Sequence, residues 1–564
     1  MTETVESLYN LIDGQWVDGE DAPFASDSPG DPNVVVAVGR RASIRQLDAA
    51  VTAAGRSLAE WSRLSTHERG GVLVQAAGVL ERNAEEWGAE LAREEGKTLA
   101  EGIGEVRRAA QILRYYGADG DREAGEVYSS PRKGERILVT RKPIGTIGVI
   151  TPFNFPIAIP AWKIAPALVY GNTVVWKPAG TVPLLAFRLA QALTEAGLPA
   201  GVVNLTFGDR EIGDAIVHHT GIDAITFTGS TGVGRGIAAA GAARGVPVQA
   251  EMGGKNAAIV LGDADLDLAV QQILLGAFRS SGQKCTATSR LVITEAVADE
   301  LLAALSKAAA DLVVGDPLDP STEMGPVITA PARDAIRAGI LRAVEQGATV
   351  LTGGDQPPVD TPEDGYFVSP TILELPSTDL DVWRDELFGP VLAVVRVPSV
   401  SEAFRVAGDG EYGLSAALFT QDLTRALEAV DDLDVGILHV NSESAGADPH
   451  VPFGGARKAG TGPKSRDVRR ASSSPTPPRS TSVVARRASD GRRHRYDRAS
   501  IGLEDVEEFA RFDRYPQLDP DLGRVEVAAE ELADLGQPTP HGVSVYAQFA
   551  CGALDVCVVP EPGP

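Results

Sequence analysis

The residue best suited to covalent chemistry in this chain is a cysteine that stands apart from the others. Cys285 lies in the segment Ser281-Gly282-Gln283-Lys284-Cys285-Thr286, and no other cysteine precedes Cys551. A thiolate attacks carbonyl carbon well near neutral pH, so Cys285 is a candidate nucleophile. A lone cysteine considered without its neighbours is more often a small hydrophobe in the core. Gly282 and the small or hydroxylated neighbours favour the nucleophile, because they let a substrate and the local backbone approach the sulfur.

Two further segments carry groups that could serve such a reaction. Residues 227–234 have the sequence Phe-Thr-Gly-Ser-Thr-Gly-Val-Gly and could open a helix whose N–H groups and dipole hold a pyrophosphate. The standard dinucleotide fingerprint is missing, and Gly229 and Gly232 would also suit a tight turn. Residues 251–256 place Glu251 before Gly-Gly-Lys-Asn. Considered alone, this carboxylate would be an ordinary strand end.

Alternating strands and helices must position these groups. The hydrophobic pattern predicts strands at 145–150, 173–178, 202–207 and 224–227, and helices at 161–169 and 183–196. This spacing predicts an α/β fold with a parallel, doubly wound sheet. Ligands in such sheets bind at the carboxyl ends of the strands, and Asn154, Lys177 and Ser230 each lie just past one.

The remaining elements divide into two groups. Helices predicted at 43–58, 66–94 and 101–116 are expected to cover the nucleotide domain rather than to do chemistry, and 127–141 should form a hairpin or an extended arm. On the other side of Glu251, the pattern predicts a strand at 256–261, a helix at 266–278 that leads to Cys285, a strand at 289–294 and a helix at 298–312.

These motifs together resemble the aldehyde dehydrogenase superfamily over about residues 10–464. The motif Glu386-Leu387-Phe388-Gly389-Pro390 and the segment His450-Val451-Pro452-Phe453-Gly454-Gly455 extend the match in the same order. The resemblance implies a Rossmann-like cofactor domain with a parallel sheet, an α/β catalytic domain and a small β oligomerisation arm. We assign 1–126 and 142–252 to the NAD(P)-binding domain, 127–141 to the arm, and 253–464 to the catalytic domain, which returns to the cofactor domain near its end.

The resemblance also assigns three catalytic roles. Cys285 would add to the aldehyde carbonyl and form a thiohemiacetal, which loses hydride to the cofactor and becomes a thioester. The side-chain amide of Asn154 and the backbone N–H of Cys285 would stabilise the oxyanion. Glu251 would act as the general base for thioester hydrolysis and could help to deprotonate Cys285. No metal is expected.

The cofactor-binding residues implied by the resemblance are Lys177, Gly229, Ser230, Glu386 and Phe388. Taken alone, Lys177 and Glu386 could be solvated surface charges and Phe388 could belong to the core. Family members often carry an acidic residue three positions after the lysine, where it bonds the ribose hydroxyls and favours NAD. This chain has Gly180 there, so the expected cofactor is NAD or NADP.

The sequence around Cys285 and the segment 450–455 look most like those of 2-oxoglutarate semialdehyde (2,5-dioxopentanoate) dehydrogenases. A substrate of that kind carries a carboxylate, so we expect a basic or multiply donating pocket. Succinate semialdehyde and other small aldehydes are alternative substrates. An inactive scaffold protein and a coenzyme A-dependent, acylating enzyme are alternative functions. Retention of Glu251 as a water-activating base argues against the acylating enzyme.

Composition limits the partners. The 564 residues carry a formal net charge of -25, which argues against nucleic acid and anionic membranes as partners. Three cysteines in so long a chain argue against a disulfide framework. With neither a signal-peptide pattern nor a long apolar run, we expect a cytoplasmic protein. By the resemblance, its partners should be a small-molecule aldehyde and further copies of the chain, as a homodimer or homotetramer.

The C-terminal region departs from the family. After Lys464 a segment rich in Ser, Pro and Arg begins, and lysine and tryptophan no longer occur. The family instead closes with a short strand that joins the oligomerisation sheet. We predict that 465–564 is an anomalous, disordered tail, produced by a shifted reading frame, that weakens the assembly.

Overall fold

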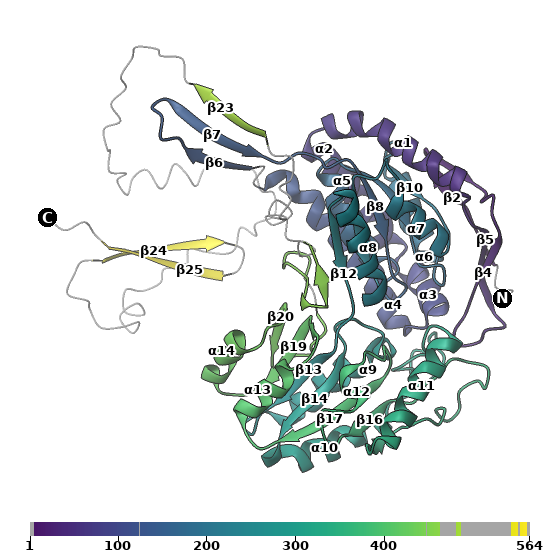
Figure 1. Ribbon diagram of the computed structural model, residues 1–564, viewed down its shortest axis with the longest axis vertical. Helices are drawn as coiled ribbons and strands as arrows, with labels where there is room; N and C mark the ends of the chain where they lie inside the picture. The colour runs from purple at the N-terminus through teal and green to yellow at the C-terminus, as the bar shows by residue number, and fades with distance from the viewer. Residues whose placement is uncertain are drawn as a thin grey trace, which may run out of the picture. The chain divides into compact units, whose positions relative to one another are not determined.

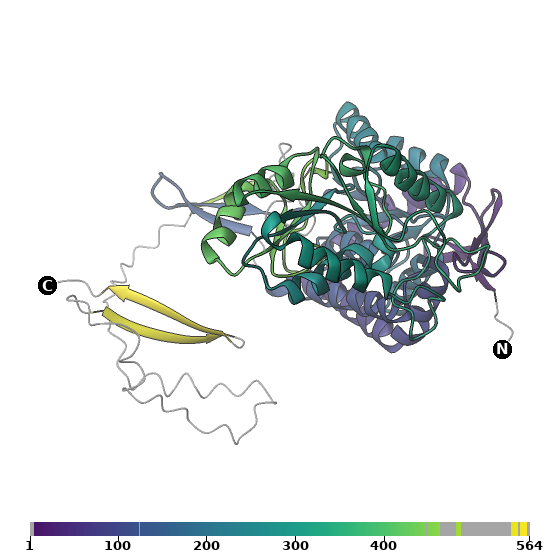
Figure 2. The ribbon, with the colours of Figure 1, turned by 90° about the horizontal axis from the view of Figure 1, so that it is seen from below.

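Two large β-sheets dominate the computed structural model of the chain, and helices cover both faces of each (Figures 1 and 2). The structure describes residues 5–122, 125–446, 448–462, 481–486, 543–550 and 553–560. The chain divides into two units, Met1–Arg487 and Ala488–Pro564, and both large sheets belong to the first. In the second unit the described residues form one antiparallel hairpin, β24 (Val543–Ala550) and β25 (Ala553–Pro560). None of the helices in these ranges has the length and hydropathy that a membrane-spanning segment requires.

The first sheet has the order β22-β12-β11-β8-β9-β10-β2-β3. Its five central strands, β12 to β10, are parallel, whereas β22 and β2 join them in the antiparallel sense. Chain order reverses beside β8, since β9 and β10 lie on one side of it and β11 and β12 on the other, and such a switch point opens a crevice at the carboxyl ends of the strands. The bounds are β2 (Asn10–Ile12), β3 (Gln15–Val17), β8 (Thr146–Ile150), β9 (Thr173–Lys177), β10 (Val203–Leu205), β11 (Ala224–Thr228), β12 (Val248–Glu251) and β22 (Gly460–Thr461).

Helices bury both faces of this sheet, which explains why its strands are continuous apolar runs. Successive residues of β9 point to opposite faces: Val174 and Trp176 pack into one apolar cluster and Val175 into another, and all three are fully buried. One face is covered by α1 (Ile44–Arg63), α7 (Arg210–His218) and α8 (Thr231–Arg244). The other is covered by α5 (Ala158–Val169) and α6 (Leu184–Glu195), with α2 (Thr66–Arg82), α3 (Ala84–Glu95), α4 (Leu99–Gly117) and the short η1 (Ala118–Asp121) outside them.

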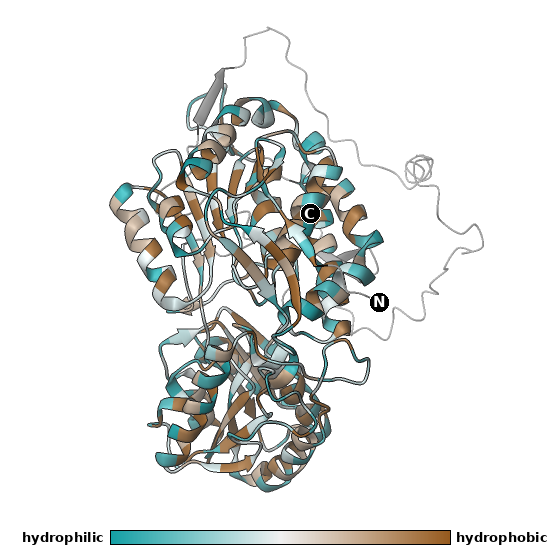
Figure 3. Ribbon diagram, turned by 90° about the vertical axis from the view of Figure 1, so that its right-hand side faces the viewer, coloured by the Kyte–Doolittle hydropathy of each residue, from teal (hydrophilic) through white to brown (hydrophobic). Residues whose placement is uncertain are grey.

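The second sheet has the order β15-β16-β17-β14-β13-β19-β20 and is parallel except at β15. Ala258 and Val260 of β13 face a cluster with α9 and α10, whereas Ala257 and Ile259 face α11, α12, α13 and α14. In Figure 3 the strands of both sheets are mostly brown, as expected for strands buried on two sides. The strands are β13 (Asn256–Val260), β14 (Thr288–Thr294), β15 (Thr349–Thr352), β16 (Thr371–Glu374), β17 (Val391–Val397), β19 (Ser415–Phe419) and β20 (Ile437–Val440). The helices are α9 (Leu266–Phe278), η2 (Arg279–Gly282), α10 (Glu295–Ala310), α11 (Ala330–Glu345), α12 (Asp381–Arg384), α13 (Val400–Gly408) and α14 (Leu423–Asp432).

Three smaller sheets complete the first unit. One has the order β1-β5-β4 and another consists of β18 and β21. The third is the hairpin of β6 and β7, joined on the β7 side by β23, whose six residues pair antiparallel with β7. The strands are β1 (Glu6–Leu8), β4 (Pro23–Asp27), β5 (Val35–Arg40), β6 (Gly125–Ser129), β7 (Glu135–Thr140), β18 (Tyr412–Gly413), β21 (Ala456–Arg457) and β23 (Thr481–Arg486).

The α/β fold with parallel sheets confirms the class predicted from the sequence. The structure differs in two places. The helix predicted at 66–94 is two helices, because the backbone leaves helical geometry at Asn83, whose side-chain amide donates to the carbonyl of Val79 at 2.9 Å. Within the tail at 465–564, predicted to be disordered, residues 481–486, 543–550 and 553–560 are strands, which suits their Val- and Ala-rich sequences. The rest of that tail lies outside the described residues.

Candidate active site

The segment before Cys285 has an unusual backbone. Ser280, Ser281 and Gly282 have φ values of 54°, 53° and 69°, so three successive residues are left-handed. For serine this costs about 1–2 kcal/mol per residue. The conformation is held by the Ser281 hydroxyl, which donates to the carbonyls of Gly325 at 2.7 Å and Pro326 at 3.1 Å. An added Cβ at residue 282 would lie 2.3 Å from the carbonyl oxygen of Gly389, so the turn requires glycine there.

The segment that begins with Glu251 packs directly against this turn. The Asn256 amide donates to the carbonyls of Cys285 at 2.8 Å and Ala287 at 2.9 Å. A Cβ added to Gly254 would lie 2.4 Å from the carbonyl oxygen of Cys285. The Gly-Gly-Lys-Asn motif therefore brings the end of β12, where Glu251 lies, against the segment that carries the thiol.

Asn154 follows β8 and reaches the same turn from the first sheet. It is buried, and its Nδ2 donates to the carbonyl of Gln283 at 2.8 Å. That bond uses one of the two amide hydrogens, and the second is the donor that an oxyanion next to Cys285 would need. The structure thus brings together the three residues predicted to be catalytic.

Cys285 and Glu251 line one cavity of about 460 Å³. Its apolar wall includes Phe155, Ile159, Trp162 and Phe453, and its basic side chains include Arg108, Arg279 and Lys284. The sequence interpretation did not identify these basic residues, and it treated the helix that contains Arg108 as covering only. No local pattern links Arg108 to Cys285, because they come from different parts of the chain and meet only in the fold.

The resting thiol is held neutral. Burial raises the pKa of Cys285 to about 12, and the negative charges of Glu386 and Glu251 contribute in the same direction. A base must therefore accept the thiol proton when the nucleophile forms. Glu251 is 5% exposed, and its Oε1 accepts a hydrogen bond from the side-chain amide of Gln249 at 2.8 Å. This bond helps to fix the orientation of the Glu251 carboxylate.

Lys163 of α5 is a second group that the sequence interpretation missed. Its Nζ donates to the carbonyl of Phe227 and the hydroxyl of Thr226, both at 2.9 Å, and to Gln249 at 3.0 Å. Burial lowers the pKa of Lys163 to about 7, and the charge of Glu251 opposes this decrease. Lys163 therefore ties α5 to the strands that end beside the cavity.

The carboxyl edge of the first sheet fits a dinucleotide. Gly229 and Ser230 follow β11, and Ser230 is the N-cap of α8 but makes no side-chain capping bond. Among the described residues, the buried hydroxyl of Thr231 has no hydrogen-bond partner, so this helix start offers a hydroxyl and orphan N–H groups to a pyrophosphate. Lys177 is the last residue of β9, which is separated from β11 by β8, and burial lowers the pKa of Lys177 to about 8. A Cβ added at Gly180 would have its nearest neighbour, the carbonyl oxygen of Gly208, at 3.8 Å, so a side chain could be accommodated at this position.

Glu386 and Phe388 reach the site from the second sheet. Glu386 accepts a hydrogen bond from the N–H of Gly254 at 2.8 Å, and burial raises the pKa of its carboxyl to about 7. Phe388 is half-buried, with a left-handed φ of 52°, and its ring meets the edge of Phe153 at a centroid distance of 5.8 Å. Glu386 therefore contacts the Glu251 segment, and Phe388 contacts the turn after β8. No cluster of three or more potential metal ligands occurs in the described part of the chain.

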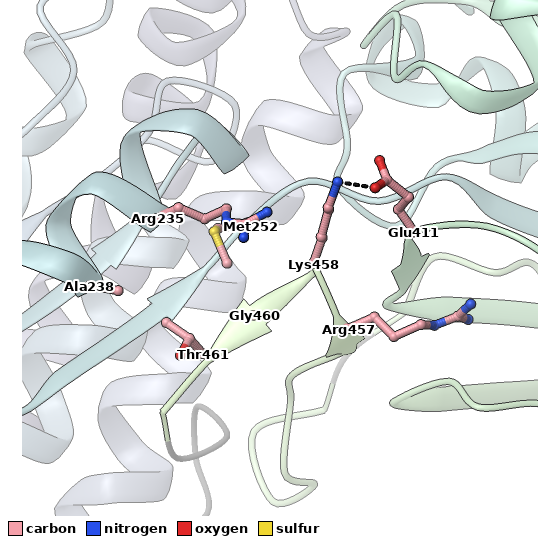
Figure 4. A pocket seen from close by; sticks show the side chains of 8 residues that line it. All are labelled: Arg235, Ala238, Met252, Glu411, Arg457, Lys458, Gly460 and Thr461. Atoms are coloured by element: carbon pink, nitrogen blue, oxygen red, sulfur yellow. Dashed lines mark hydrogen bonds and ion pairs between the residues drawn. The ribbon is translucent and has the colours of Figure 1, made fainter.

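A second cavity, of about 520 Å³, lies beside β22 (Figure 4). Lys458 forms an ion pair with Glu411, and the Arg457 side chain points away from Met252 and donates to the carbonyl of Asp434 at 3.1 Å. Arg457 and Lys458 thus bond to groups of the protein, and the cavity near Cys285, which contains both a thiol and a carboxylate, is the better candidate for chemistry.

The chain is similar to known proteins over most of its length. The sequence model of the aldehyde dehydrogenase family matches residues 16–473. An alpha-ketoglutaric semialdehyde dehydrogenase from Bacillus subtilis (strain 168) is 40% identical over 459 residues, which cover 81% of this chain and 94% of the relative. A 2,5-dioxopentanoate dehydrogenase from Saccharolobus solfataricus is 36% identical over 459 residues, 81% of this chain and 95% of the relative. The crystal structure of PnpE in complex with nicotinamide adenine dinucleotide has a TM-score of 0.78 at 36% identity and covers 81% of this chain and 94% of that chain.

Proposed function

Because the chain belongs to the aldehyde dehydrogenase family, its reaction is the NAD(P)-dependent oxidation of an aldehyde to a carboxylic acid, and we propose 2-oxoglutarate semialdehyde as the substrate. The names of the two relatives support this choice. The observation that carries it is the group of basic side chains, Arg108, Arg279 and Lys284, in the wall of the cavity that contains Cys285. A substrate with a carboxylate at its far end can bond such cations while its aldehyde reaches the thiol.

The arrangement of these cations supports a role in binding. Arg279 is about half-exposed and lies 3.5 Å from Glu101 and 3.7 Å from Glu443, which are too long for strong hydrogen bonds. Lys284 lies 3.8 Å from Glu443. Arg108 donates to Asp448 at 3.2 Å and to Gln111 at 3.1 Å. A substrate carboxylate would therefore compete with long or solvent-exposed ion-pair contacts rather than with short, buried pairs.

In the proposed reaction, each side chain around the aldehyde has a separate role. Cys285, once deprotonated, forms a C–S bond to the carbonyl carbon, and the carbonyl oxygen becomes an oxyanion that Asn154 and the Cys285 N–H stabilise. Lys177, Gly229, Ser230, Glu386 and Phe388 would hold NAD(P) at the carboxyl edge of the first sheet, and the bound cofactor would supply the acceptor for the hydride that leaves the thiohemiacetal carbon as the oxyanion collapses to the thioester carbonyl. Glu251 then removes a proton from water, the water oxygen attacks the thioester, and the C–S bond breaks to release acid and thiol.

The purified enzyme tests the substrate directly. We would follow NADH and NADPH formation with 2-oxoglutarate semialdehyde, succinate semialdehyde and pentanal. The proposal requires the highest kcat/KM with 2-oxoglutarate semialdehyde. A higher value with succinate semialdehyde would shift the assignment to that substrate, preference for pentanal would remove the carboxylate argument, and no reduced cofactor with any aldehyde would favour an inactive scaffold.

Charge-removing variants test the cavity argument. Arg279→Met should lower kcat/KM for 2-oxoglutarate semialdehyde roughly tenfold, the loss of one charge-assisted hydrogen bond, and should leave pentanal nearly unchanged. Arg107→Met is the matched control, because Arg107 precedes Arg108 on α4 but is exposed and pairs with Glu85. Equal losses with both aldehydes would mean that Arg279 shapes the site rather than binding the carboxylate.

We also propose that the chain assembles as a homodimer or homotetramer and that it works in the cytoplasm. We further propose that its domains divide as predicted from the sequence. The hairpin of β6 and β7 supports assembly, because Val127 and Tyr128 on β6 are 69% and 50% exposed and this strand is a sheet edge. The need to keep the Cys285 thiol reduced supports the location. Light scattering of the purified chain, with Val127→Lys as the variant expected to dissociate, tests the assembly.

A further inference from the structure

Helix α4 begins with a buried charge cluster that none of the assigned roles uses. Lys97, just before the helix, is 2% exposed, and its Nζ lies 2.7 Å from Glu105 Oε2 and 4.0 Å from Glu95 Oε1. It also lies 3.7 Å from the ring centroid of Phe155. Burying a charged lysine this deeply costs several kcal/mol unless hydrogen bonds and ion pairs compensate. The groups that Lys97 contacts are therefore important to the local structure.

Both members of the Lys97–Glu105 pair bond the turn that carries Asn154. Lys97 Nζ donates to the backbone carbonyl of Asn154 itself. Glu105 Oε1 accepts from the N–H groups of Ile157 and Ala158, each at 3.2 Å, and these are the N-cap and first residue of α5. The pair therefore holds the turn at both ends, at the oxyanion donor and at the helix that follows it.

The same helix also holds the nucleophile's turn. Glu101 Oε1 accepts from the N–H of Ser280 at 2.9 Å and from its hydroxyl at 3.0 Å. Glu101 Oε2 closes the N-terminal capping box of α4 with Thr98, which fixes this carboxylate in place. One turn of α4 thus connects the left-handed segment before Cys285 with the turn that carries Asn154.

We propose that Lys97 and Glu105 are positioning residues that set the distance between the Asn154 amide and the thiol of Cys285. The inference rests on the proposed role of Asn154 as oxyanion donor. A displacement of about 1 Å in such a group can cost up to a hundredfold in rate. A merely structural pair would instead change stability and cofactor binding without acting through Asn154.

A double-mutant cycle tests the proposal. The paired variant Lys97→Met/Glu105→Gln removes both charges together, so neither is left buried alone, and the glutamine oxygen still accepts from Ile157 and Ala158. We expect kcat to fall roughly ten- to a hundredfold, with nearly unchanged KM for NAD(P). In the Asn154→Ala background the same pair of changes should lower kcat less than about threefold, because the group that it positions is gone.

Three controls separate the possible failures. If the paired variant does not fold, the single variant Glu105→Gln takes its place in the cycle. Glutamine has nearly the same size as glutamate and keeps an oxygen that accepts the hydrogen bonds from Ile157 and Ala158. Glu94→Gln alters a neighbouring buried carboxylate that bonds Leu184 instead, at 3.1 Å, and should retain kcat. An Asn154→Ala variant with full activity would refute the proposed oxyanion role. A normal loss in that variant, combined with an undiminished effect of the paired changes in its background, would refute only the positioning role of Lys97 and Glu105.

Discussion

The environment of Cys285 leads to a prediction about its reactivity before any ligand binds. Burial and the charges of Glu386 and Glu251 raise the pKa of the thiol from 9.0 to about 12. The difference corresponds to about 4 kcal/mol in favour of the neutral form. At pH 8 roughly one molecule in ten thousand would carry a thiolate, compared with roughly one in ten for an ordinary thiol. Alkylation by iodoacetamide, which reacts with the thiolate, should therefore be slower than for a small thiol, by up to about a thousandfold, because the greater intrinsic nucleophilicity of a thiolate with a higher pKa offsets part of the difference.

The perturbation is Glu386→Gln in the ligand-free enzyme. Among the two charges, Glu386 has the larger influence on Cys285, so its removal should lower the pKa of the thiol and speed alkylation at pH 8. If the pKa of the thiol fell by one, the thiolate fraction at pH 8 would rise about tenfold, and the alkylation rate would rise by up to the same factor. Glu443→Gln is the matched control, because Glu443 lines the same cavity but is not among the largest causes of the raised pKa of Cys285.

The assay measures the alkylation rate against pH from 6 to 11 and locates Cys285 by mass spectrometry. The reasoning requires a rate that still rises above pH 10 in the parent enzyme and a profile displaced to lower pH in Glu386→Gln. An inflection near pH 9 in the parent would refute the burial argument. Equal displacement in Glu386→Gln and Glu443→Gln would refute the specific charge effect.

Three further results are expected. Cys285→Ala should abolish oxidation of aldehydes while NAD(P) still binds, as measured by fluorescence titration; retained turnover would remove the nucleophile assignment. Glu251→Gln should give a burst of NAD(P)H followed by slow turnover, because hydrolysis of the thioester is impaired more than its formation, and stopped-flow absorbance would show an unchanged steady rate if another base acts. Gly282→Ala should destabilise the chain by at least about 1 kcal/mol in denaturant unfolding and lower activity, because its Cβ would meet the carbonyl of Gly389 at 2.3 Å; a neutral effect would mean that the turn can relax.

The elements that carry the site could be predicted because their signals are local. The apolar run of β9 ends at Lys177, and α9 is found at the predicted residues because its apolar periodicity ends where the chain turns toward Cys285. The left-handed backbone at Ser280 and Ser281 could not be predicted, because serine has no preference for it and contacts from distant residues impose it. The sequence analysis missed Lys97 for a similar reason. Its proposed role depends on a hydrogen bond to Asn154, which is distant in the sequence and comes close only in the folded chain.

Among the described residues, the region beyond Lys464 and the candidate site involve different strands. β22, at Gly460–Thr461, pairs with β12, so that Gly460 lies opposite Glu251, and the N–H of Met252 donates to the carbonyl of Ala459 at 2.8 Å. Among the described residues, the strand that pairs with the Glu251 segment therefore ends at residue 461, before Lys464, after which the sequence analysis predicts a departure from the family. The strand that follows within the tail, β23, pairs with β7 of the hairpin and not with either sheet of the site. Changes in sequence beyond Lys464 should therefore act on assembly through β7, while Glu251, Asn154 and Cys285 keep the contacts that hold them together.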